Sequence, residues 1–162
     1  MKHIPCLSRR DFTNKGETLI EAIGALAIIA IVVTAASVAI ITALSNANFN
    51  QNQTQSTKFA QQGLEVVRQI RDADYTGFRT YAGTYCLAEG QTVLNTPVAS
   101  CPNPNVSEFI RTVTVTQDGC SVNVAEVSVK VAFTDGKCQL GEYCHDQTHT
   151  SCLTTVNPII AP

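Results

Sequence analysis

One run of the chain constrains its fold more than any other feature. Residues 22–44 (AIGALAIIAIVVTAASVAIITAL) form a stretch of 23 residues without a charge, and no comparable run follows. A helix of this length rises about 35 Å, at about 1.5 Å per residue, and the hydrocarbon core of a bilayer is about 30 Å thick. The run is also longer than the ~7–15 apolar residues of a secretory signal. Because every face is apolar, lipid or other helices must surround it, and we predict a membrane-competent helix.

Charge is distributed unevenly about this run. Residues 1–15 carry four basic residues and one acidic residue, whereas residues 17–162 carry seven basic and twelve acidic residues. Positive flanks of membrane helices stay in the cytoplasm, so we expect the short N-terminus inside and the bulk of the chain outside. An acidic outer part without a basic patch argues against nucleic acid as a partner.

Cysteine usage agrees with export. Of the seven cysteines, Cys6 lies on the cytoplasmic side of the apolar run, and an even number follows it. Disulfides persist in oxidising compartments, so up to three are expected, and six cysteines permit 15 pairings. Cys101–Cys120 and Cys138–Cys144 are plausible local loops. The six candidates are Cys86, Cys101, Cys120, Cys138, Cys144 and Cys152.

The junction between the basic segment and the apolar run carries a specific motif. Lys15-Gly16 is followed by Glu17 and then by Thr18-Leu19-Ile20-Glu21. This pattern resembles the processing site of type IV prepilins. The resemblance implies cleavage after Gly16 by a prepilin peptidase, methylation of the new amino terminus at Glu17, and a buried assembly glutamate at Glu21. The sequence departs from the family at Glu17, where phenylalanine is usual, and at Val38, where many pilins carry a helix-kinking proline.

The chemistry of Glu21 agrees with an assembly role. A carboxylate at the start of a membrane helix is costly unless it finds a partner, which makes it a functional-site hypothesis by default. The natural partner is the α-amino group freed at residue 17 of a neighbouring subunit. Buried ion pairs often do little more than offset desolvation, so the expected role is to set the axial register between subunits. The alternative is an interfacial side chain that reaches the headgroups at the bilayer edge.

A different reading of the N-terminal region is open. Residues 8–12 (SRRDF) resemble a twin-arginine export signal, and residues 45–47 (SNA) form a small-residue cleavage site. The mature protein would then begin near Asn48 as a soluble exported binding protein. Paired arginines before a membrane segment more often serve as a cytoplasmic charge anchor.

Beyond residue 44 the pattern predicts one continuous helix from Glu17 to Asp74, 58 residues or about 87 Å long. Residues 45–58 are almost wholly polar, and we expect them to be solvated or to contact other subunits. An apolar stripe follows at spacings of three and four, which should pack on a sheet. The stripe comprises Phe59, Gly63, Leu64, Val66, Val67 and Ile70.

Short alternating segments follow and predict an antiparallel sheet. The first expected elements are a short strand at 79–87, a strand at 108–117 and a turn at Asp118-Gly119. A return run at 121–133 follows, with a bulge or a break between strands at Ala125-Glu126, then a turn at Asp135-Gly136 and a last strand at 151–156. The fold class is therefore α+β, a long N-terminal helix on a small antiparallel β-sheet head, as in type IV pilins. The predicted organisation is a leader (1–16), a membrane or filament-core helix (17–44), its amphipathic continuation (45–76) and a disulfide-bonded head (77–162).

Candidates for catalysis or metal binding are few. Cys138, Cys144, His145, His149 and Cys152 lie within fifteen residues, which invites a zinc interpretation. Cys-x₂-Cys spacing is absent, and disulfide formation would compete for the thiols of an exported protein. We therefore expect disulfides and surface histidines, no metal, no cofactor and no catalytic residue, and a protein that is not an enzyme.

Together these features predict a structural subunit, major or minor, of a type IV pilus-like filament. The implied partners are other pilin subunits, the prepilin peptidase, the pilus assembly machinery and the inner membrane that holds the precursor before assembly on the cell surface. A pseudopilin of a type II secretion or DNA-uptake machine is the alternative within the same class.

Overall fold

Helix α1 (Glu17–Ala73) begins at the residue where the sequence predicts it and ends one residue earlier than expected. We obtained a computed structural model of the chain, and it describes residues 17–139 and 141–156. No proline, which would remove a backbone donor and clash with the preceding turn, lies between Glu17 and Ala73. By its internal contacts the chain divides into two units, Met1–Leu44 and Ser45–Pro162.

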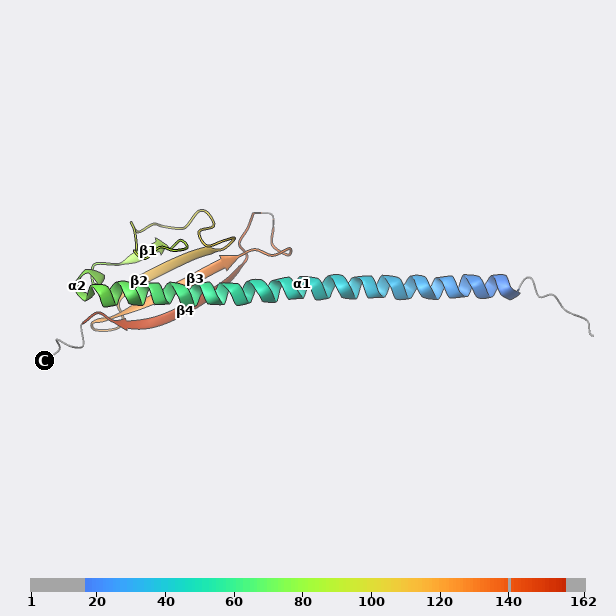
Figure 1. The fold of residues 1–162 in the computed structure, drawn as a ribbon, viewed down its shortest axis with the longest axis horizontal. Coiled ribbons are helices and arrows are strands. Elements are labelled where there is room, and N and C mark those ends of the chain that lie inside the picture. The colour runs from blue at the N-terminus through green and yellow to red at the C-terminus, as the bar shows by residue number, and fades with distance from the viewer. Residues whose placement is uncertain (1–16, 140, 157–162) are drawn as a thin grey trace, which may run out of the picture. The chain divides into compact units, whose positions relative to one another are not determined.

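The second unit is built on a four-stranded antiparallel sheet of order β1-β2-β3-β4. Its strands are β1 (Gly83–Cys86), β2 (Ile110–Ser121), β3 (Val124–Phe133) and β4 (His145–Thr154). Neighbours in sequence are neighbours in the sheet, which is the usual arrangement of consecutive strands. Residues 45–73 of α1 run along one face of this sheet (Figure 1). The unit is therefore α+β, as the sequence predicts.

The helix packs on the sheet through small and aliphatic side chains. Ala60, Leu64 and Val67 are buried and meet the inward valines of β2 and β3. A Cβ built on Gly63 would lie 2.8 Å from Val129 Cγ1 and 3.2 Å from the Arg111 side chain. Gly63 therefore permits an approach of helix to sheet that a larger residue would prevent. The predicted stripe is confirmed at its centre, while Phe59, Val66 and Ile70 at its margins are partly buried against the core.

The polar stretch before the stripe is less uniform than expected. Phe49 is partly buried, and its ring lies 6.0 Å from that of Phe133 and 5.1 Å from that of His145. The Asn52 side chain donates to the backbone carbonyl of Thr134 at 3.4 Å. Contact with the sheet thus begins at Phe49, ten residues before the apolar stripe starts, because one aromatic residue in a polar segment is enough to anchor it.

The β2–β3 hairpin differs from the prediction. Pairing is regular from Ile110↔Ala132 to Thr116↔Glu126, and resumes at Ser121↔Val124. The connection at residues 122–123 is therefore the turn. Asp118-Gly119, predicted as the turn, lies in the irregular part of β2.

Strand β3 is continuous and regular, so the bulge or break predicted at Ala125-Glu126 is wrong: the irregularity is on β2, between Thr116 and Ser121. Ala125 lies on the buried face with Val127 and Val129, and Val124 does not. The prediction failed because the alternation of apolar residues was counted from Val122 and Val124, and neither of these residues lies on the buried face of the sheet. The turn is compact because Asn123 adopts φ 62° and its backbone N–H donates to Asp118 Oδ1 at 2.6 Å.

The remaining boundaries follow local chemistry. Asp74 ends α1 and caps the short helix α2 (Tyr75–Phe78), accepting a hydrogen bond from Gly77 N at 2.9 Å. The predicted turn at Asp135-Gly136 is confirmed, with Cys138 N donating to Asp135 O at 3.1 Å. The last strand, predicted at 151–156, begins earlier, at His145, since β4 pairs along the whole of β3.

Candidate functional site

The first unit presents an exposed apolar surface. In helix α1 every residue from Thr18 to Leu44 is exposed, and the large hydrophobic side chains are 56–71% accessible. Within the described residues, α1 is the one helix that is long and apolar enough to cross a membrane. The exposed large side chains are Leu19, Ile20, Ile23, Leu26, Ile28, Ile29, Ile31, Val32, Val33, Val38, Ile40, Ile41 and Leu44.

The hydroxyl groups of Thr34, Ser37 and Thr42 are satisfied within the helix. Thr34 Oγ1 donates to Ala30 O at 3.0 Å or to Ile31 O at 2.9 Å. Ser37 and Thr42 bond the carbonyls four residues earlier, at 2.8 and 2.9 Å. In lipid an unsatisfied polar group costs several kcal/mol, so these bonds let the segment enter an apolar surrounding without exposing hydroxyls.

Glu21 is the one charged residue between Thr18 and Leu44. It lies in the first turns of α1 and is exposed in the single chain. Glu17, the predicted first mature residue, is the first residue of α1. Gly16, after which cleavage is expected, lies outside the described residues, as does Cys6. The processing and assembly roles of these residues stay predictions.

The six cysteines of the second unit form three disulfides. Cys86–Cys101 joins β1 to the following loop, Cys120–Cys152 joins β2 to β4, and Cys138–Cys144 closes the loop between β3 and β4. Of the two local pairings suggested by the sequence, Cys138–Cys144 is present and Cys101–Cys120 is wrong. Cys86 and Cys101 meet because the loop after β1 folds back, with Val98 N donating to Thr84 O at 2.7 Å.

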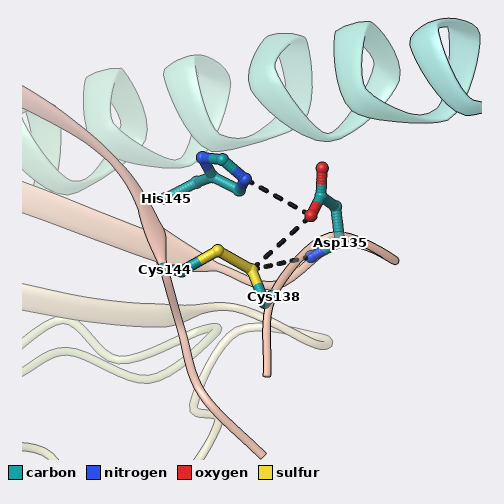
Figure 2. A group of neighbouring side chains, drawn as sticks. All are labelled: Asp135, Cys138, Cys144 and His145. Atoms are coloured by element: carbon teal, nitrogen blue, oxygen red, sulfur yellow. Dashed lines mark hydrogen bonds and ion pairs between the residues drawn. A yellow bond between two sulfur atoms is a disulfide. The ribbon is translucent and has the colours of Figure 1, made fainter. Parts of the chain in front are cut away.

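The histidine- and cysteine-rich segment is divided by the sheet. Asp135, Cys138, Cys144 and His145 gather at the end of β3 and the start of β4, and Figure 2 shows the four side chains facing one another. His149 lies farther along β4, opposite Val129, and Cys152 is bonded to Cys120. The sequence identified Cys138, Cys144 and His145 as close together. It missed Asp135, whose only signal is its place in a turn.

Asp135 and His145 lie against each other in this cluster. His145 Nε2 is 3.3 Å from Asp135 Oδ1, and the Asp135 side chain is 7% exposed. The pKa of the Asp135 carboxyl is held below its usual value, chiefly by a hydrogen bond from the Lys137 backbone N–H at 2.8 Å. Burial opposes this lowering, and the nearby His145 adds to it. Asp135 is therefore an anionic group poised beside an imidazole.

A second charged residue is buried in the head and was not singled out from the sequence. Arg111 on β2 is 3% exposed, and it donates to Leu87 O at 2.9 Å, Ala88 O at 2.8 Å and Phe59 O at 3.3 Å. Burial lowers its pKa, and the charge of Glu89 opposes the shift. One guanidinium thus donates to three carbonyls, one from α1 and two from the loop after β1. Its role is structural, because it links the helix, the sheet and the loop. Its signal in the sequence is a charged residue in phase with Phe109 and Val113.

Comparison with known proteins gives one match. Residues 12–37 match the family model described as the prokaryotic N-terminal methylation motif. No curated protein and no solved structure matches the chain significantly. The match covers the predicted cleavage site, Glu21 and the first part of the exposed apolar segment.

Proposed function

Because the methylation motif and the fold support a type IV pilin-like prepilin, we propose that this chain is a structural subunit of a surface filament. It takes part in pilus or pseudopilus assembly as a membrane-anchored precursor. The finer proposal is that cleavage after Gly16 releases a subunit that leaves the bilayer and enters a helical filament on the cell surface. It acts by assembly, not by catalysis.

The observation that carries this proposal is the exposed apolar segment of α1. Thirteen large hydrophobic side chains lie on all sides of the helix, each more than half accessible. Full burial of such a side chain contributes about 1.5–3 kcal/mol, so the segment requires lipid before assembly and other helices after it. In the filament, the same segments of neighbouring subunits are the helices that cover these side chains.

Glu21 provides the selectivity that apolar packing lacks. Hydrophobic contact is non-directional and tolerates sliding of one helix along another. A single carboxylate in a segment of 27 exposed residues, Thr18–Leu44, pairs best at one stagger, where it meets the amino terminus of a neighbour. This explains why the segment carries a charge at all.

The test is the mass of the processed chain. Surface material is sheared from the cells. The N-terminal peptide and the intact mass of the released protein are then measured before and after reduction. We expect a chain that begins at N-methylated Glu17 with its six head cysteines oxidised. A chain that begins near Asn48 would overturn the proposal and favour the exported soluble protein, although residues 45–47 lie inside α1.

One observation favours a minor subunit or pseudopilin over a major pilin. Glu17 occupies the position where the family usually has phenylalanine, and this adds a second carboxylate one turn before Glu21. Like charges four residues apart on a helix repel mildly, which weakens the same contact in a homopolymer. The fraction of this chain among the proteins of sheared filaments distinguishes a major pilin from a minor subunit or pseudopilin. A major pilin dominates the preparation, and a minor subunit or pseudopilin does not.

A further inference from the structure

Four side chains with metal-binding atoms meet at the junction of β3 and β4. Asp135 and Cys138 come from the turn after β3, Cys144 immediately precedes β4, and His145 is the first residue of β4. One ligand atom from each lies within 4.8 Å of all the others. Among the described residues, this is the one group of three or more such side chains that gathers in this way.

The donor set has the character of a zinc site. Two sulfurs, one imidazole nitrogen and one carboxylate oxygen are ligands that Zn²⁺ accepts in tetrahedral geometry. Softer thiolates select zinc over magnesium or calcium, which prefer oxygen. The Asp135 oxygen and His145 Nε2 are already 3.3 Å apart, and Cys138 Sγ lies 3.5 Å from the same oxygen. Two ligands on one zinc are separated by about 3.2–3.8 Å when the bonds are about 2.0–2.3 Å.

His145 is held in place without a hydrogen bond at its inner nitrogen. Its ring stacks on Phe133 at 5.4 Å and meets the edge of Phe49 at 5.1 Å. Nε2 is buried and makes no hydrogen bond with any described residue, although it lies 3.3 Å from Asp135 Oδ1 as an ion-pair contact. A buried polar atom without a hydrogen bond is costly. This nitrogen points into the cluster in Figure 2, where a metal ion would give it a bond.

The disulfide decides whether the sulfurs are available. In the structure Cys138 and Cys144 are bonded to each other, so neither can act as a thiolate ligand. We propose that when this disulfide is reduced, Asp135, Cys138, Cys144 and His145 bind one Zn²⁺, and that the site is closed while the disulfide is intact.

The chemistry of the switch balances. A dithiol or phosphine reductant supplies two electrons, the S–S bond breaks, two protons are taken up, and two thiols form as the reductant is oxidised. Zn²⁺ then displaces both thiol protons to solvent and forms two Zn–S bonds. Neutral His145 and anionic Asp135 complete the four ligands. The sulfurs part to about 3.8 Å, the spacing set by two Zn–S bonds of about 2.3 Å.

Two of the ligands, Asp135 and His145, are also held by contacts other than the disulfide. Phe133 and His145 are a register pair of the β3–β4 ladder, which fixes His145 beside the end of β3. Asp135 is held by the Lys137 backbone N–H, and its carbonyl accepts from Cys138 N. Cys138–Cys144 spans only six residues, the shortest of the three loops. Closing a short loop restricts the unfolded chain least, so its reduction costs the head least.

The test uses the full chain in detergent micelles with Cys6→Ser, which removes the thiol outside the head. The protein is reduced with a phosphine and titrated with Co²⁺, whose thiolate charge-transfer and visible ligand-field bands report the ligands. We expect one Co²⁺ per chain with two thiolates, displaced by Zn²⁺, and no binding by the oxidised protein. Cys120→Ser/Cys152→Ser should bind as before, whereas Cys138→Ser/Cys144→Ser should not.

The histidines provide the matched pair. His145→Ala should weaken Co²⁺ binding by more than the ~10–100-fold that the loss of a supporting residue around a metal costs, and His149→Ala on the same strand should leave it unchanged. Asp135→Asn should weaken binding and alter the visible bands. If reduction unfolds the head, Co²⁺ must restore its circular-dichroism spectrum. No binding by the reduced protein, or equal binding by His145→Ala, would overturn the proposal.

Discussion

Asn105 holds Arg111 by both ends of its amide: Arg111 N donates to Asn105 Oδ1 at 2.7 Å, and Asn105 Nδ2 donates to Arg111 O at 2.9 Å. This side chain therefore adds to the backbone pairing of β2, in which Leu87 N also donates to Arg111 O at 3.3 Å. It also aligns the residue whose guanidinium joins Phe59 O to Leu87 O and Ala88 O. One amide thus supports the contact between the loop after β1, the sheet and helix α1.

Asn105→Ala should lower the free energy of unfolding of the head by about 1–3 kcal/mol, because it leaves the partly buried backbone N–H of Arg111 without a partner. The Arg111 carbonyl keeps the hydrogen bond from Leu87 N at 3.3 Å. Urea unfolding of the detergent-solubilised chain, followed by circular dichroism, measures the change. Asn103→Ala in the same loop is the control, since Asn103 is exposed and its replacement should stay within about 0.5 kcal/mol. Equal stability of the two variants would show that the amide bridge contributes nothing.

Gly63→Ala should destabilise the head, although alanine is the better helix former by about 1 kcal/mol. The added Cβ would lie 2.8 Å from Val129 Cγ1, and relieving such overpacking costs about 1–3 kcal/mol. Gln61→Ala, two residues away on an exposed position, should be neutral. The same urea titration decides the matter: a Gly63→Ala variant more stable than the parent would mean that α1 shifts away from β3 at little cost.

Glu21→Ala should abolish filament assembly, and Glu21→Gln should do the same, because both remove the charge that we assign to subunit register. Filament yield after shearing and the amount of membrane-held precursor are measured together, so that failed assembly is separated from failed expression. Glu65→Ala is the control: its carboxylate is exposed and pairs only with Arg68 among the described residues, at 3.4 Å, so yield should be unchanged. A normal yield of filaments from the Glu21→Ala variant would refute the assembly role of Glu21.

Asp135 should make the stability of the head sensitive to acid. Its folded-state pKa lies below the value in the unfolded chain, so its contribution is present above the unfolded pKa and is lost as pH falls through the folded pKa. Asp135→Asn should therefore lose less stability than the parent between about pH 5 and about pH 2. Glu142→Gln, an exposed carboxyl in the same loop, serves as the comparison in acid titrations at fixed urea. Parallel curves for parent and Asp135→Asn would contradict the assignment.

The three disulfides should contribute according to the length of the loops they close. The Cys120–Cys152 loop spans 32 residues and the Cys138–Cys144 loop spans 6. By loop entropy their removal should cost about 4 and about 2 kcal/mol respectively. Paired serine variants, compared in urea, check the order. A reversed order would show that contacts around Cys138 and Cys144 matter more than loop length.

The sequence by itself determined the features that depend on local pattern. The charge-free run at 22–44 specified an apolar helix, and the Lys15-Gly16 to Glu21 pattern, which lies within the matched motif, specified the class of protein. Spacings of three and four residues placed the face of α1 around Leu64 and Val67 on the sheet, and alternation gave the α+β class. The predictions of the helix face and of the fold class succeed because the helix and strand periodicities are properties of the backbone that a few consecutive residues reveal.

Tertiary structure decided what depends on residues distant in the chain. The pairing of Cys86 with Cys101 follows from the loop after β1 folding back on that strand, and the pairing of Cys120 with Cys152 joins β2 to β4 across β3. From the sequence alone, six cysteines permit 15 pairings. The two-residue turn at 122–123 replaced Asp118-Gly119 because the ladder with β3 continues past that pair.

The same holds for the two clusters of the head. Arg111 is buried with its charge because carbonyls of α1 and of the loop after β1 converge on it. Asp135 meets His145 because β3 and β4 pair in a register that brings the two ends of their loop together. Hydrogen bonding and ligand geometry are set by three-dimensional proximity, which hydrophobic periodicity does not encode.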